Sequence, residues 1–303
     1  MIEESQSFKI QTVNRRFLPF DSEKEKQWQG PFFFIQGADC QPGLTYLWTD
    51  TGRMEPTSDM PMKWDIEIEA TRAVIKKINQ MKPKPKFFIV CGDIVDAFPF
   101  EEPFRSQQEK DIKNVFNELD PSIPLVCVCG NHDIGNEPTR ESIQSYINNF
   151  GDDYFDFYCG GIHCIVINSQ FYAHSLNVED LKLKHEQWLD NVLKDKQSKH
   201  IIIFQHLPWF LNEYNEENEY FNIEINLRIK MLEKFHLAGV KKIFCGHYHR
   251  NAGGLFKSME QVITSAIGLQ LGNDKSGVRL VRVTENDIEH QYFPTEDIPL
   301  NFL

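Results

Sequence analysis

The sequence predicts an α/β fold whose sheets are mixed, with both parallel and antiparallel strands. Short apolar runs rich in Ile, Val and Phe recur along the chain, as is typical of buried strands. Segments with helical periodicity lie between these runs, and alternation of strand and helix favours parallel pairing. Two further segments have the pattern of hairpins, which add antiparallel strands. With 303 residues, the chain is long enough to bury the core that such a fold needs.

Five apolar runs are predicted to be strands. Each is short, is rich in β-branched or aromatic residues, and is bounded by polar, Gly or Pro residues. The runs are PFFFIQGAD (31–39), KFFIVCGD (86–93), PLVCVCGNHD (124–133), HIIIFQH (200–206) and KKIFCGHYH (241–249).

Helices and hairpins complete the predicted elements. The segment 64–82 has Ile68, Ile75 and Ile78 on one helical face. A second helix is predicted to end at Gly239, after an apolar face formed by Leu227, Met231, Phe235 and Ala238. Gly160 and Gly161 separate the two arms of one predicted hairpin, 154–159 and 162–168, and the segment 277–293 is expected to reverse direction at residues 284–287.

The composition favours one globular domain. Hydrophobic residues make up 41% of the chain and charged residues 25%, which is ordinary for a globular protein and excludes collagen-like and disordered classes. No repeat or low-complexity tract is long enough to act as a linker, so residues 31–303 are predicted to form a single domain. Residues 1–30 are polar and lack clear periodicity, and we expect an N-terminal extension that either wraps the body or is partly disordered.

Charge and hydropathy exclude several classes of partner. The 32 basic and 44 acidic residues give a net charge of −12, which argues against a broad surface for nucleic acid or anionic lipid. No run approaches the roughly 18 apolar residues that cross a bilayer, so no membrane partner is expected. The opening MIEESQSFKI lacks the pattern of a secretory signal, and the seven cysteines include no Cys-x-x-Cys pair. We therefore expect a cytoplasmic protein with reduced, mostly structural cysteines.

Each of the five predicted strands stops at a residue that can bind a metal ion. These residues are Asp39, Asp93, Asn131, His206 and the pair His247 and His249. Ligands in open α/β folds gather at the carboxyl ends of strands, so these side chains are expected to converge on one cleft. Polar residues that merely cap helices would explain one such strand end, but five in one chain favour a metal site.

The predicted ligands indicate which metals the site would bind. Two carboxylates, one amide and three imidazoles suit manganese, iron, zinc or magnesium better than a soft metal that prefers thiolates. Six ligands exceed the four of a tetrahedral ion, but they match two ions roughly 3.5–4 Å apart that share a carboxylate. The sequence therefore predicts a centre of two divalent metal ions.

The order of these blocks resembles the signature of the calcineurin-like metallophosphoesterases. The blocks are DCQ (39–41), GDIVD (92–96), GNHD (130–133), His206 and GHYH (246–249). The resemblance implies a four-layer α-β-β-α sandwich of two mixed sheets, the metallophosphoesterase fold. It also implies that Asp93 bridges two metals, of which one is held by Asp39 and His249 and the other by Asn131, His206 and His247.

The resemblance further implies a reaction, the hydrolysis of phosphomonoesters by in-line attack of a metal-bridging hydroxide. His132, fixed by its neighbour Asp133, would protonate the leaving oxygen, and both His132 and Asn131 would contact the substrate. The branch of the family that the sequence resembles most is regarded as cytosolic serine/threonine protein phosphatases that act on the kinase Akt. The implied partner is a phosphoprotein or another phosphomonoester, with an Akt-type kinase as one candidate.

The sequence departs from the wider family at two positions that bear on the site. Gln41 stands where most members of the superfamily have His, and we expect it to bind a metal through its amide oxygen, more weakly than an imidazole would. Ala97 and Phe98 follow the second block, where the classical serine/threonine protein phosphatases carry an arginine that grips phosphate. Arg250, directly after His249, is the predicted substitute for that arginine.

Alternative functions stay open at this point. A phosphodiesterase or a small-metabolite phosphatase would use the same metals, and a non-catalytic scaffold would have the same fold. The segment 212–222, NEYNEENEYFN, holds four glutamates. It is either a solvated loop or a rim that attracts basic residues beside a phosphorylated site.

Overall fold

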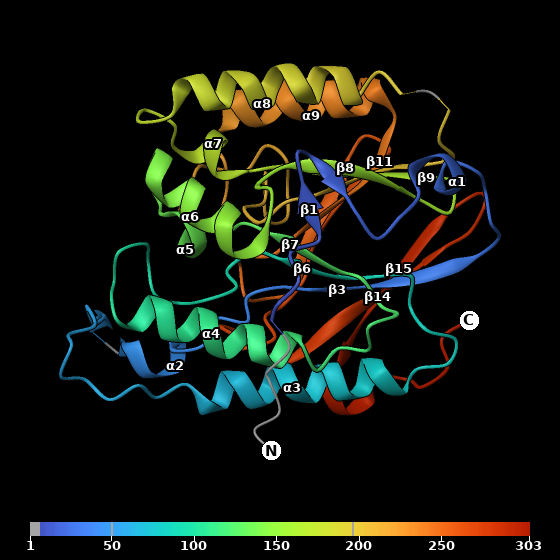
Figure 1. Ribbon diagram of the computed structural model, residues 1–303. Helices are drawn as coiled ribbons and strands as arrows, with labels where there is room; N and C mark the ends of the chain where they lie inside the picture. Colours follow the sequence, from blue (N-terminus) through green and yellow to red (C-terminus); the bar gives the residue numbers. More distant parts are fainter. Residues whose placement is uncertain (1–6, 50, 196) are drawn as a thin grey trace.

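The fold has four layers, in the order helix, sheet, sheet, helix. The computed structural model describes residues 7–49, 51–195 and 197–303. An eight-stranded and a five-stranded sheet face each other, with α8 and α9 outside the first and α3 and α4 outside the second (Figure 1). Both sheets contain parallel and antiparallel pairs. The predicted α-β-β-α sandwich of two mixed sheets is therefore confirmed.

The five-stranded sheet has the strand order β15-β14-β3-β6-β7. Strands β3, β6 and β7 run parallel, and β14 pairs antiparallel with β3 and with β15, which confirms the C-terminal hairpin. The strands are β3 (Phe32–Gly37), β6 (Phe88–Cys91), β7 (Leu125–Val128), β14 (Gly277–Val283) and β15 (Ile288–Pro294).

The eight-stranded sheet has the order β1-β2-β8-β9-β10-β11-β13-β12. Its centre is parallel from β9 through β10 and β11 to β13, whereas β8 pairs antiparallel with β9 across the predicted Gly160-Gly161 turn. The strands are β1 (Thr12–Val13), β2 (Arg16–Phe17), β8 (Phe155–Cys159), β9 (Ile162–Val166), β10 (Ile201–Phe204), β11 (Val240–Cys245), β12 (Ala252–Phe256) and β13 (Met259–Ile263). A separate small hairpin pairs β4 (Trp48–Thr49) with β5 (Gly52–Arg53).

Both predicted helices are present, as α3 (Asp65–Gln80) and α9 (Ile225–Ala238). In α3, Ile75 and Ile78 are fully buried, and α9 ends at Gly239 in the left-handed conformation that Gly adopts without strain. The other helices are α1 (Ser22–Glu25), α2 (Leu44–Leu47), α4 (Phe104–Phe116), α5 (Asn131–Ile134), α6 (Arg140–Phe150), α7 (Gln170–Ala173), α8 (Glu179–Val192) and the 3-10 helix η1 (Thr295–Asp297).

A core rich in phenylalanine fills the space between the two sheets. Phe34 of β3 stacks on Phe87 with ring centroids 4.6 Å apart, and it meets Phe204 and Phe244 of the opposite sheet edge-on at 5.6 and 5.8 Å. Because side chains alternate along a strand, the neighbouring Phe33 faces the other way and packs in the core beneath α3 and α4. This double burial explains why the strands are continuous apolar runs in the sequence.

The described part of the N-terminal segment, residues 7–30, joins the eight-stranded sheet at its edge. Strands β1 and β2 pair with each other, and Arg16 pairs with Asp156 of β8. The Glu25 carboxylate accepts a hydrogen bond of 2.6 Å from the backbone N–H of Gly160. Residues 1–6 of the predicted extension lie outside the described residues, and the division of the chain at residue 31 stays a prediction.

All seven cysteines are free and buried, as expected for structural thiols. Burial raises the pKa of Cys91 and Cys245, so the reactive thiolate is disfavoured next to the strand ends. In the described part of the chain, no helix combines the length and apolar character that a membrane crossing requires.

Candidate metal centre

The predicted ligands come from the carboxyl ends of strands in both sheets. In the five-stranded sheet, Asp39 follows β3, Asp93 follows β6, and Asn131 follows β7. In the eight-stranded sheet, His206 follows β10, and His247 and His249 follow β11. Within the sheets, Asp39 N–H donates to the carbonyl of Gly92 and Gly246 N–H to that of His206. Between the sheets, His247 N–H donates to the Asp39 carboxylate. The two sheets therefore present their ligands to one common point.

Five of the seven residues predicted to bind metal have a left-handed backbone conformation that is rare for residues other than glycine. Their φ angles are +55° for Asp39, +33° for Gln41, +50° for Asp93, +71° for His247 and +52° for His249. Such strain persists only where the surrounding structure imposes it, and it clusters at functional sites. The loops after β3, β6 and β11 thus turn sharply at their ligands.

Asp93, His206 and His247 form the first group of possible ligands, with donor atoms within 4.8 Å of one another. His206 Nε2 lies 3.2 Å from Asp93 Oδ2, 3.1 Å from Asn131 Oδ1 and 3.2 Å from His247 Nδ1. His206 Nδ1 lies 2.8 Å from the carbonyl of Cys91, so that nitrogen holds the proton and Nε2 is left to bind a cation.

The second group shares Asp93 with the first and adds Asp39 and His249, again within 4.8 Å. His249 Nε2 lies 3.4 Å from Asp39 Oδ1, while its Nδ1 contacts the carbonyl of Leu269. The Asp39 carboxylate also accepts the backbone N–H of His247 at 3.1 Å. One carboxylate common to two ligand groups is the arrangement that a pair of neighbouring divalent ions requires.

Unpartnered polar atoms show that these residues fit metal ions. Gln41 Oε1 and His247 Nε2 are buried and have no hydrogen-bond partner among the described residues. Leaving such atoms without a partner is unfavourable, and coordination to a metal would remove that penalty. The donors are oxygen and imidazole nitrogen, which suit manganese, iron, zinc or magnesium.

Buried negative charge controls the protonation of the imidazoles. Burial would raise the pKa of Asp93, but the positive charges of His206 and His132 outweigh it and hold the pKa below its usual range. Burial would lower the pKa of His206, but the Asp93 carboxylate raises it to about 9. Burial and the neighbouring His206 charge keep the pKa of His247 well below its usual value. The two aspartates therefore create a pocket that attracts cations.

His132 lines one cavity together with the ligands Asp93, His247 and His249. The residue that orients its imidazole is Asp96. His132 Nδ1 is 2.5 Å from the backbone carbonyl oxygen of Asp96, and its ring stacks on Phe98 with centroids 4.3 Å apart. The Arg53 guanidinium also lies over the Phe98 ring, 4.8 Å from its centroid, and forms ion pairs with Asp96 and Glu101. The sequence analysis missed this group, although Asp96 stands inside the block GDIVD.

The predicted contact between Asp133 and the His132 imidazole is wrong. The Asp133 carboxylate instead accepts backbone N–H groups, from Gly130 at 2.7 Å and from Ile94 at 3.0 Å. Burial and the nearby Asp93 charge raise the pKa of Asp133 to about 7. Asp133 thus ties the loops after β6 and β7 together, because its side chain bridges their backbones.

Arg250 does not enter the cavity as predicted. Its guanidinium donates to the carbonyl of Leu271 at 2.8 Å and lies over the ring of Tyr248, 4.7 Å from the centroid. Tyr220, which the sequence analysis did not single out, lines the cavity instead. Its ring packs against His247 with centroids 5.3 Å apart, and the side-chain amide of Asn131 hydrogen-bonds its hydroxyl.

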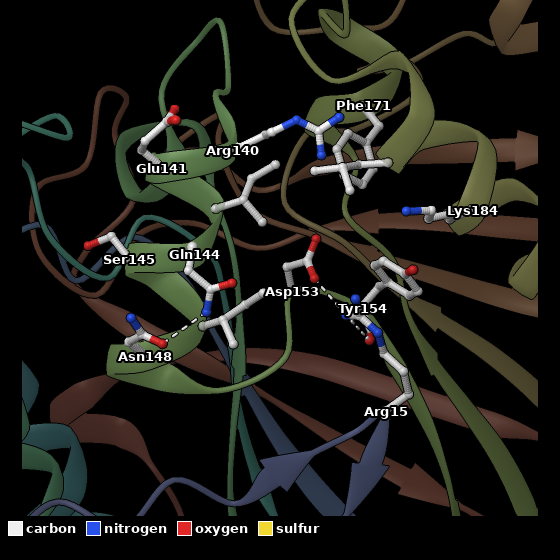
Figure 2. A pocket seen from close by; sticks show the side chains of 13 residues that line it. Arg15, Arg140, Glu141, Gln144, Ser145, Asn148, Asp153, Tyr154, Phe171 and Lys184 are labelled. Carbon is white, nitrogen blue, oxygen red and sulfur yellow. Dashed lines mark hydrogen bonds and ion pairs between the residues drawn. The ribbon is translucent and has the colours of Figure 1, made fainter.

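The cavity above these groups has a volume of about 370 Å³. Its lining combines the predicted ligands Gln41, Asp93, His247 and His249 and the imidazole of His132 with mostly apolar residues: Leu44, Trp48, Tyr220, Phe221 and Leu271. A larger cavity of about 810 Å³ lies elsewhere, between α6 and α8, where Asp153 binds Arg15 (Figure 2). None of the predicted metal ligands lines this larger cavity between α6 and α8.

Comparison with known proteins agrees with this geometry. The calcineurin-like phosphoesterase family matches residues 46–251, a range that includes five of the predicted ligands: Asp93, Asn131, His206, His247 and His249. The chain is 43% identical over 292 residues to a zebrafish (Danio rerio) protein named serine/threonine-protein phosphatase CPPED1, covering 95% of this chain and 93% of the relative. It is 44% identical over 288 residues to the human (Homo sapiens) protein of the same name, covering 94% of this chain and 90% of the relative.

A solved structure shows that the fold is shared beyond these relatives. The purple acid phosphatase PPD1 from yellow lupin (Lupinus luteus) superimposes with a TM-score of 0.63 at 10% identity, over 90% of this chain and 53% of that one. The likeness concerns the fold alone, since the sequences have diverged. The family match and the close relatives together show that this chain belongs to the calcineurin-like phosphoesterase family.

Proposed function

We propose that this chain is a metal-dependent phosphomonoesterase that hydrolyses phosphoserine and phosphothreonine in protein substrates. The observation that supports the chemistry is the buried Asp93 carboxylate, which belongs to two groups of possible metal ligands at once. The support for the substrate class comes from the relatives, which are named serine/threonine-protein phosphatases and are matched over more than nine tenths of this chain.

Two divalent ions would be held by the residues that the structure brings together. Asp93 would bind both, and the remaining ligands divide into the set Asn131, His206 and His247 and the set Asp39, Gln41 and His249. When bound, such ions polarise a phosphoryl group and generate a nucleophile from water at neutral pH. Manganese, iron, zinc and magnesium all suit these ligands.

The protein's own part in the reaction rests on His132. Because the Nδ1–H of His132 donates to the Asp96 carbonyl, Nε2 is free to take up a second proton, and the resulting imidazolium delivers that proton to the departing serine or threonine oxygen. The stack on Phe98 limits rotation of the imidazole, so the proton is delivered in one direction. The apolar residues in the cavity lining lower the local polarity, which would strengthen these electrostatic contacts.

The physiological partner is a phosphoprotein in this proposal, and an Akt-type kinase is one candidate by resemblance. The cytoplasm is the proposed compartment. Seven buried free thiols support it, because cytosolic proteins keep their cysteines reduced.

Three substrates would test the proposal, each assayed with added Mn²⁺: a phosphoserine peptide, p-nitrophenyl phosphate and bis-p-nitrophenyl phosphate. We expect hydrolysis of the two monoesters and none of the diester. Asp93→Asn is expected to lose both activity and Mn²⁺ binding, while the control Asp180→Asn on α8 keeps them. Faster cleavage of the diester would favour a phosphodiesterase, and no turnover of any substrate would favour a scaffold.

A second variant tests the role of His132. His132→Ala is expected to slow the phosphoserine peptide by about 10²–10⁴-fold, because a serine oxygen leaves only with a proton. The effect on p-nitrophenyl phosphate should be smaller, because p-nitrophenolate leaves as a stable anion. Equal losses with both substrates would contradict a proton-donating role.

A further inference from the structure

A second cavity adjoins the metal centre. Its volume is about 440 Å³, and it shares Tyr220 and His247 with the cavity above the metal ligands. Residues of the acidic segment 212–222, of α7 and of the start of α9 form its walls. A substrate whose phosphate lies over the metal ligands would therefore pass Tyr220 on its way into this second space.

The lining of this second cavity is acidic and polar. Glu219 and Glu224 supply two carboxylates, the other polar residues are four amides, two tyrosines and two histidines, and no Lys or Arg occurs among its described lining residues. The Glu224 carboxylate accepts the backbone N–H groups of Asn226 and Leu227 at 3.0 Å each. These hydrogen bonds hold the pKa of Glu224 below its usual range, so the charge persists at neutral pH.

The acidic segment is held in place by hydrogen bonds of its own. The Glu216 carboxylate accepts the backbone N–H groups of Leu211, Asn212 and Glu213 at 2.6–3.0 Å. Behind the segment, the buried guanidinium of Arg228 donates to the carbonyls of Ile223, Tyr214 and Glu216. The Glu216 carboxylate is thus occupied by hydrogen bonds within the loop, and its negative charge offsets the positive charge of Arg228. Glu219 stays on the cavity side, with its backbone N–H bound to Asn222.

Besides the imidazoles of His174 and His247, two polar groups in the cavity wall have a buried atom without a hydrogen-bond partner among the described residues. Gln170 and Tyr172 are each only 4% exposed, and Gln170 Oε1 and the Tyr172 hydroxyl have no hydrogen-bond partner among the described residues. Buried acceptors of this kind are unfavourable unless a donor reaches them. Lys and Arg side chains carry three and five N–H donors, so they match both the charge and the unmet acceptors.

We propose that this second cavity binds a Lys or Arg side chain of the substrate, one or two positions from the phosphorylated residue. The spacing follows from the shared wall, because a residue of extended chain spans only about 3.3–3.6 Å. The inference rests on the proposed protein phosphatase function and adds a substrate preference to it. Glu219 is then the main residue that determines this specificity.

Two phosphoserine peptides, identical except for Arg or Glu at the flanking positions, test the proposal through their ratio of kcat/KM. The wild-type protein with Mn²⁺ is expected to prefer the Arg peptide. Glu219→Gln should lower this ratio about two- to fivefold, the size of a partly exposed ion pair. Glu219→Lys should lower it further, and added salt should reduce the wild-type ratio. Glu213→Gln, on the same loop but outside the cavity lining, should leave the ratio unchanged.

The outcomes separate this inference from the proposed function. Equal turnover of the two peptides by the wild-type protein would overturn the basic subsite while leaving the phosphatase function in place. A change for Glu213→Gln as large as that for Glu219→Gln would also overturn it, because general electrostatics would then explain the preference. Turnover of p-nitrophenyl phosphate without turnover of either peptide would overturn the protein phosphatase proposal and the subsite with it.

Discussion

His185 is a buried imidazole outside the metal centre, on the inner face of α8. Neither ring nitrogen has a hydrogen-bond partner among the described residues, and the ring packs edge-on against Tyr154 with centroids 4.7 Å apart. Burial lowers the pKa of His185 to about 3, with a smaller contribution from nearby positive charges. The folded protein therefore keeps this imidazole neutral at pH values where an exposed histidine is charged.

His185→Phe is expected to make the protein more resistant to acid. The folded pKa of about 3 lies below the unfolded value of about 6.5, so the unfolded state binds the proton first as the pH falls. The neutral His185 makes its full contribution to the free energy of unfolding above pH 6.5. As the pH falls to 4.5, about 2–3 kcal/mol of this stability is lost. Urea unfolding at both pH values measures the difference. An unchanged pH dependence of stability in His185→Phe would contradict the assignment.

At the scale of elements, the strand-end loops pack too closely for a side chain at certain glycines. A Cβ at Gly130, between β7 and α5, would lie 2.1 Å from Asp93 Oδ1 and 2.4 Å from the Asp93 backbone nitrogen. Gly130 has an ordinary φ of −110°, so the requirement for glycine is purely one of space. The glycine before the ligand Asn131 therefore fixes the position of the shared carboxylate on the neighbouring loop.

Gly130→Ala is expected to displace Asp93 and to weaken Mn²⁺ binding by about 10–100-fold, as for other changes next to a metal ligand. Titration calorimetry and the metal content of the purified protein would measure the loss. Gly239→Ala is a suitable control, because a Cβ there meets nothing within 4 Å. Its left-handed backbone should make the control less stable by about 1–2 kcal/mol without affecting metal binding. Wild-type affinity in Gly130→Ala would show that the loops can move apart.

Over the whole molecule, the metal centre joins the two sheets. Asp39, Asp93 and Asn131 belong to the five-stranded sheet, and the three histidine ligands belong to the eight-stranded one. Between Asp39 and His249 lie more than 200 residues of sequence, so the site exists only when both sheets are folded and in contact. Metal binding is therefore linked to the stability of the complete fold.

Mn²⁺ at about 100 times its dissociation constant is expected to stabilise the folded protein by about 2.7 kcal/mol per site. For a protein of this size, that corresponds to a rise in Tm of roughly 4 °C per site, which calorimetry can measure. EDTA should reverse the rise, and Asp93→Asn should show none because it lacks the shared ligand. A Tm that does not respond to Mn²⁺ in the wild-type protein would contradict a site that spans both sheets.

The sequence alone predicted the fold class and the residues that meet at the centre. Both signals are local: a buried strand is a short apolar run, and each candidate ligand stands directly at the end of such a run, as His206 does after Ile201–Phe204. The order of the blocks was specific enough to indicate the family. The convergence of these residues is now a structural observation, while their role as metal ligands stays a prediction.

Contacts between distant segments could be decided only by the tertiary structure. The partner of the His132 imidazole is the backbone carbonyl of Asp96, and a carbonyl is present at every residue, so no sequence pattern marks it. Arg250 follows a ligand directly, yet its side chain turns toward Leu271, because backbone direction and packing decide where a long side chain points. Tyr220 reaches Asn131 from a loop that is anchored by Glu216 and Arg228. The sequence by itself determined which chemical groups meet at the strand ends, and the packing of the two sheets decided what surrounds them.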